Sequence, residues 1–64
     1  MEVALQDARR AIDQVISGER TSVQLSSQDA MLRKMQHQMA KEANLFSRSS
    51  GAEPQRRVTI YANR

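Results

Sequence analysis

The absence of cysteine limits how a chain of 64 residues can hold a fold together. Without thiols the chain can form neither disulfides nor a thiolate metal site, and its single histidine, His37, excludes a multi-histidine site. A domain of this size buries only about 60% of the surface that its unfolded chain exposes. We therefore predict one small domain over residues 1–64 that is stabilised by apolar packing and uses no metal and no cofactor.

Residues 2–17 have the pattern of an amphipathic helix. Their apolar side chains recur at helical spacing and form one stripe, which consists of Leu5, Ala8, Ala11, Ile12, Val15 and Ile16. Gly18 suits the position that ends such a helix. Residues 21–25 follow with β-branched side chains and alternating polarity, which predicts a short strand.

A second helix is predicted over residues 28–43. Ser26 and Asp29 match the Ser-x-x-acid pattern that caps helix N-termini. At about 100° per residue, one face of this helix is apolar and carries Met31, Leu32, Met35, Met39 and Ala43. We expect this face to fill the core, because methionine adapts to irregular gaps. The opposite, solvent-facing side is predicted to carry Arg33, His37, Lys41 and Asn44.

Residues 45–61 have the pattern of a β-hairpin. Residues 45–50 and 56–61 are predicted strands, and the residues between them include Gly51 and Pro54, which favour a turn. The second strand has the strongest β preference in the chain, and Val58 and Ile60 are expected to face the helices. The alternating positions, expected to face away, are Arg57, Thr59 and Tyr61.

The predicted order of elements is helix, strand, helix, strand, strand, which indicates an α+β fold. The two hairpin strands are antiparallel, and the crossover through the second helix is expected to be right-handed. These rules predict a three-stranded antiparallel sheet of order 1-3-2 with two helices packed on one face. A three-helix DNA-binding fold is the alternative, and the strong strand pattern of residues 56–61 argues against it.

Positive charge is concentrated in the second half of the chain. Residues 1–32 carry three arginines against five acidic residues, whereas residues 33–64 carry seven basic residues against two acidic ones. A basic half on a small domain favours a polyanionic partner. Ordinary solubilising charge is the alternative explanation.

Six side chains of this half form the candidate binding site, and they are Arg33, His37, Lys41, Arg48, Arg56 and Arg57. The first three follow one row of the predicted helix, and the hairpin arginines are expected beside that row. Arginine forks match phosphate oxygens, and a nearby phosphate favours a protonated histidine, which Arg33 alone would disfavour. Because Phe46 and Tyr61 are the only aromatic residues available for stacking, we expect binding to depend on charge and to discriminate bases poorly.

Two motifs resemble those of the R-three-H domain, which is named for an arginine and a histidine separated by three residues. The first is Arg-Lys-Met-Gln-His at residues 33–37, and the second is Gly-Ala-Glu-Pro-Gln-Arg-Arg-Val at residues 51–58. The resemblance covers residues 5–61 and implies a three-stranded sheet with two helices on one side. It also implies binding of single-stranded DNA or RNA, with Arg33 and His37 on the basic surface.

The segment around the histidine is similar to versions of this domain attached to bacterial and plastid P-loop ATPases. The chain has no glycine-rich phosphate loop, so the resemblance implies no ATPase activity for it. It departs from the family at residues 29–30, where members often carry tyrosine or another bulky group and this chain has small residues. This departure reduces the surface available for stacking.

These observations predict non-catalytic binding of single-stranded DNA or RNA through a basic surface centred on Arg33 and His37. We expect an accessory module of a larger nucleic-acid-processing protein, cytoplasmic, monomeric as an isolated domain, and without a membrane partner or a small-molecule substrate. A protein-interaction module with a basic docking face is the alternative, favoured by the shortage of aromatic residues. An enzyme is disfavoured, because His37 has no carboxylate or nucleophile beside it on its helical face.

Overall fold

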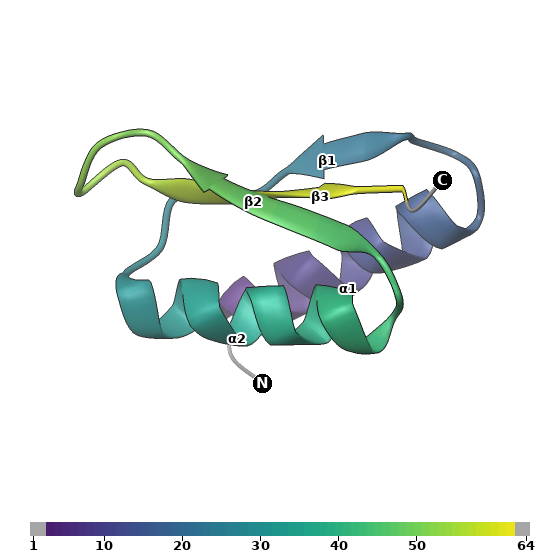
Figure 1. Cartoon of the computed structure of the whole chain (residues 1–64), viewed down its shortest axis with the longest axis horizontal. Helices are drawn as coiled ribbons and strands as arrows, with labels where there is room; N and C mark the ends of the chain where they lie inside the picture. Colours follow the sequence, from purple (N-terminus) through teal and green to yellow (C-terminus); the bar gives the residue numbers. More distant parts are fainter. Residues whose placement is uncertain (1–2, 63–64) are drawn as a thin grey trace.

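The sheet is organised around the last strand of the chain (Figure 1). In this computed structural model, which describes residues 3–62, β3 (Arg57–Tyr61) lies between β1 (Ser22–Gln24) and β2 (Phe46–Ser50) and pairs antiparallel with both. The predicted sheet order 1-3-2 is confirmed. β3 suits the central position because its β-branched and aromatic side chains favour a strand paired on both sides.

Two helices cover one face of this sheet. α1 (Val3–Ile16) and α2 (Ala30–Glu42) pack side by side against it, and in the described residues no helix covers the other face (Figure 1). The predicted α+β class and element order are confirmed, and each element is slightly shorter than its predicted range. The predicted first helical residue, Glu2, lies outside the described residues. Neither helix within residues 3–62 has the length and apolar character that a bilayer crossing requires.

The core lies between the helices and the sheet. Val58 and Ile60 of β3 are fully buried on the helix-facing side, as predicted. They pack in one cluster with side chains of α1, which are Ala8, Ala11, Ile12 and Val15. Because alanine side chains are short, they let the backbone of α1 approach its neighbours closely.

The second helix buries a different side from the one predicted. Met31 and Met35 are 69% and 41% exposed, whereas Arg33 and Gln36 are buried. Met39 alone among these methionines packs against the core, half-buried. The prediction that the methionine face fills the core is therefore wrong for Met31 and Met35, because α2 is rotated to bring polar side chains inward.

The buried polar residues of α2 are tolerated because they have specific partners. The side-chain amide of Gln36 donates a hydrogen bond to the backbone carbonyl of Ala4 at 3.0 Å, which joins α2 to the first turn of α1. A buried polar group without such a partner would destabilise the fold. Helical periodicity could not predict this contact, because its acceptor lies far away in the sequence.

The N-terminus of α2 also differs from its prediction. Asp29 is the N-cap residue, and its carboxylate accepts a hydrogen bond from the backbone N–H of Leu32 at 3.0 Å. Ser26, which the Ser-x-x-acid pattern assigned to this position, lies before the helix. The cap satisfies one of the free N–H groups that every helix leaves in its first turn. Arg33 follows in that turn.

Candidate functional site

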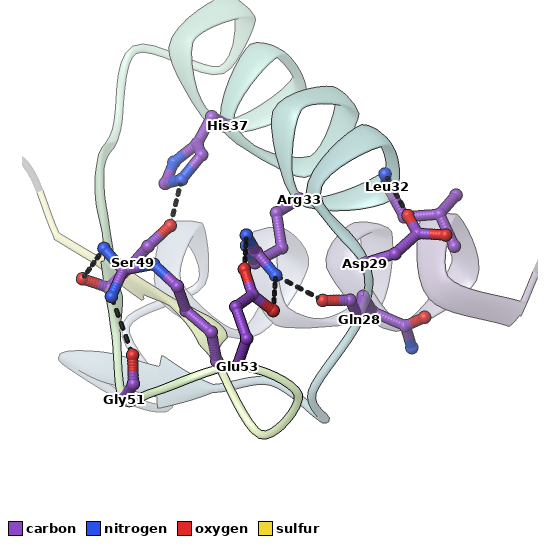
Figure 2. A network of polar contacts seen from close by, with 9 residues as sticks. Gln28, Asp29, Leu32, Arg33, His37, Ser49, Gly51 and Glu53 are labelled. Atoms are coloured by element: carbon purple, nitrogen blue, oxygen red, sulfur yellow. Dashed lines mark hydrogen bonds and ion pairs between the residues drawn. The ribbon is translucent and has the colours of Figure 1, made fainter.

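Arg33 joins the start of α2 to the turn between β2 and β3 (Figure 2). Its Nη1 donates to the carbonyl of Gln28 at 2.6 Å and to Oε1 of Glu53 at 3.2 Å, and its Nη2 donates to Oε2 of Glu53 at 2.6 Å. The two bonds to Glu53 form the parallel fork that arginine makes with carboxylates. Arg33 is 7% exposed. It is therefore not on the open, solvent-facing surface that was predicted, and its counter-charge comes from the hairpin turn, where the side chain of Glu53 is itself 61% exposed.

His37 lies one turn further along α2 and faces β2 (Figure 2). Its Nδ1 is 2.6 Å from the hydroxyl oxygen of Ser47, and its Nε2 is 2.7 Å from that of Ser49. Both serines are on the helix-facing side of β2, since they pair with the buried Ile60 and Val58. A neutral imidazole donates through one nitrogen and accepts through the other, and either serine can supply the matching role.

The neutral form of His37 is favoured by its surroundings. Partial burial lowers the pKa of the ring below its ordinary value of 6.5, and the positive charges of Arg33 and Arg56 lower it further. The predicted effect of Arg33 on this ring is confirmed. With no anion beside it, the imidazole is therefore neutral at neutral pH.

Arg56 completes a group of basic side chains between α2 and the hairpin. Its Nη1 donates to the carbonyl of Gly51 at 2.7 Å, and its Nη2 lies 3.5 Å from the carbonyl of Ser49. Gly51 has a φ of +94°, a conformation that glycine adopts without strain, and this tight turn brings its carbonyl toward Arg56. We call Arg33, His37 and Arg56 the hairpin cluster.

The other three predicted site residues do not join the hairpin cluster. Lys41 is exposed near the end of α2. Arg48 and Arg57 lie on the opposite, uncovered side of the sheet, because successive strand residues point to opposite faces. One continuous exposed surface holding all six residues, as expected from the sequence, is therefore absent from the described structure. The six side chains are divided between two faces that meet at the edge strand β2.

Sequence reasoning missed several residues of this site. Ser47 and Ser49, the partners of His37, could have been identified from the alternation of residues 45–50, which places both on one side of the strand. Glu53 was noted only as part of a motif, and no local pattern indicates its ion pair with Arg33.

Comparison with known proteins supports the resemblance noted in the sequence. The family model of the R-three-H domain matches residues 3–62. An uncharacterized protein of Porphyra purpurea, ycf45, is 45% identical over 58 residues, which cover 91% of this chain and 10% of that protein. The chain thus spans about a tenth of the length of this relative. No solved structure matches the chain.

Proposed function

The chain belongs to the R-three-H domain family, and from this membership we propose that it binds single-stranded DNA or RNA without catalysing a reaction. Domains of this family are generally single-stranded nucleic-acid-binding modules. The observation that carries the proposal is the convergence of Arg33, His37 and Arg56 between α2 and the hairpin. This arrangement favours an anion, because Arg56 donates to backbone carbonyls and not to a carboxylate, and it lies near the neutral ring of His37, which a phosphate would help to protonate.

We assign different roles to the members of the hairpin cluster. His37 and Arg56 are proposed to contact phosphates, together with the exposed Lys41 on the same side of the sheet. A phosphate beside His37 would offset the neighbouring arginines and favour the protonated ring. Arg33 contributes charge and, through its ion pair with Glu53, holds the hairpin against α2.

Arg48 and Arg57 are proposed to contact the same strand from the other side of the sheet. β2 is an edge strand, so a nucleic-acid strand that passes over this edge can reach both groups of basic residues. We further propose that the chain serves as an accessory module of a larger nucleic-acid-processing protein. The length of the Porphyra purpurea relative, about ten times the matched part, supports this arrangement.

A titration at two salt concentrations tests the proposed binding. Fluorescence anisotropy of labelled single-stranded and duplex DNA and RNA would give each affinity. We expect single strands to bind more tightly than duplexes, with log K falling by about 0.7 per log unit of salt for each phosphate contacted. Absence of single-strand binding at low salt would overturn the proposal.

A protein-interaction module is the second candidate, and one observation favours it. Met31 and Met35 lie one turn apart on α2 and are both exposed, and exposed methionines are common on surfaces that dock protein partners. Tight binding of a partner protein, combined with no oligonucleotide binding at low salt, would decide for this candidate.

A further inference from the structure

The outer face of the sheet, which neither helix covers (Figure 1), carries both Phe46 and Tyr61, the phenylalanine and the tyrosine of the chain. Phe46 and Tyr61 are directly opposite each other in the pairing of β2 with β3. Phe46 is 59% exposed and Tyr61 is 38% exposed. Opposite residues in an antiparallel pair have Cβ atoms only about 5 Å apart, so the two rings form a single apolar patch.

This patch borders a hollow on the molecular surface. The hollow has a volume of about 480 Å³, and Phe46, Arg48 and Tyr61 are among its lining residues. A planar base therefore has room to lie against the aromatic rings.

The charge of the outer face suits a nucleic acid. Strand pairing places eight residues on it, which are Ser22, Gln24, Phe46, Arg48, Ser50, Arg57, Thr59 and Tyr61. Two of these eight are arginines and none is acidic. Arg48 lies two positions from Phe46 on β2 and borders the apolar patch, whereas Arg57 lies four positions from Tyr61 on β3, about 13 Å along the strand. Aromatic rings beside basic side chains and without carboxylates match unpaired bases joined by phosphates.

We propose that unpaired bases of a single strand stack on Phe46 and Tyr61, while Arg48 binds an adjoining phosphate and Arg57 binds a phosphate further along the nucleic acid. This inference rests on the proposed function and deepens it, because it assigns base contact to the face opposite the hairpin cluster. The strand passes over the β2 edge, with phosphates at the hairpin cluster on one side and bases on the outer face on the other. Stacking is tolerant of base identity, so little sequence preference is expected.

Tyrosine fluorescence offers a direct test on the unmodified chain. Tyr61 is the only tyrosine and there is no tryptophan, so the intrinsic emission reports on this one ring. We expect a base-containing single strand to quench that emission on binding. An abasic strand of equal length, which has the same phosphates, should bind more weakly and leave the emission unchanged.

A substitution at Phe46 gives an independent measurement. Phe46→Leu retains an apolar side chain but removes the ring, and we expect it to weaken binding of the base-containing strand about 10-fold. Its affinity for the abasic strand should stay the same. Met31→Leu, at an exposed apolar position on α2, is the matched control and should bind both strands as the unmodified chain does.

The outcomes separate this inference from the proposed function. If anisotropy shows no binding of any single strand, the proposed function fails and the stacking surface fails with it. If strands bind but tyrosine emission is unchanged and abasic strands bind equally well, the stacking surface alone is overturned. Both outcomes are measured on the unmodified chain, so neither requires a substituted variant to fold.

Discussion

Arg33 stabilises the fold, although the sequence presents it as part of a binding motif. Its guanidinium binds a carboxylate 20 residues away in sequence and a backbone carbonyl that precedes the helix. Removing the side chain would leave both acceptors without this donor, and bonds to charged groups stabilise more than neutral ones. Weaker oligonucleotide binding in an Arg33 variant would therefore reflect both lost charge and a displaced hairpin.

Replacing Arg33 with alanine is expected to lower the free energy of unfolding by about 1–3 kcal/mol. Urea denaturation followed by circular dichroism would measure the change. Lys34→Ala is the matched control, since Lys34 is the adjacent residue, has the same charge and is exposed. It should change the free energy of unfolding by less than about 0.5 kcal/mol. Equal stability of the two variants would show that the ion pair contributes nothing measurable.

His37 is expected to make the stability depend on pH. Burial and the two neighbouring arginines lower the pKa of the folded-state ring below 6.5, so the unfolded chain binds the proton more readily. The contribution of His37 to stability is then complete above about pH 6.5 and is lost as pH falls toward the lower pKa of the folded state.

Thermal unfolding between about pH 7.5 and pH 5 would measure this dependence. The melting temperature should fall on acidification within this window. His37→Gln removes the titrating ring, so its profile should be flatter over the same range. A variant that loses stability with the same slope as the unmodified chain would assign the dependence to other groups.

At the level of the elements, β2 separates the two proposed contact surfaces. Ser47 and Ser49 face α2 and hold His37, whereas Phe46 and Arg48 face outward. This alternation was predictable from the strand period. The orientation of α2 was not, because its apolar stripe indicated a buried side that the structure leaves exposed at Met31. A stripe of apolar residues predicts the buried side only when polar residues elsewhere on the helix have no partners in the core.

Two alanine substitutions distinguish the observed start of α2 from the predicted one. Asp29→Ala removes the carboxylate that caps the helix and should lower the free energy of unfolding by about 1 kcal/mol. Ser26→Ala should change it by less than about 0.5 kcal/mol, because Ser26 is exposed and lies outside the helix. Chemical denaturation of both variants would give the values, and a larger effect at Ser26 would contradict the assignment of the cap.

The molecule as a whole presents basic residues on two faces rather than one. Lys41 represents the helix side, and Arg48 represents the outer face. If the nucleic acid contacts only one face, its binding should depend on only one of these two residues. If the nucleic acid passes over the β2 edge, its binding should depend on both residues. The effects of substitutions at well-separated residues usually add.

Substituting glutamine for Lys41 and Arg48, singly and together, tests this arrangement. Each single variant should weaken single-strand binding and reduce the salt slope by about 0.7, with the double variant showing the sum. Arg9→Gln, at an exposed position on α1, makes the same change in net charge and should affect the slope less. If only the substitution of Lys41 weakened binding, the nucleic acid would contact the helix side alone.

The sequence alone determined the elements and the α+β class, because helical periodicity, strand preference and turn residues act over short stretches of chain. It also determined the sheet order, because the hairpin and the handedness of the crossover leave few possible topologies. The tertiary structure decided which side of α2 is buried. Arg33 depends on Glu53, and Gln36 depends on a carbonyl in the first turn of α1. Hydropathy describes each residue separately, whereas burial of a polar side chain is stabilised only by a partner that folding brings beside it.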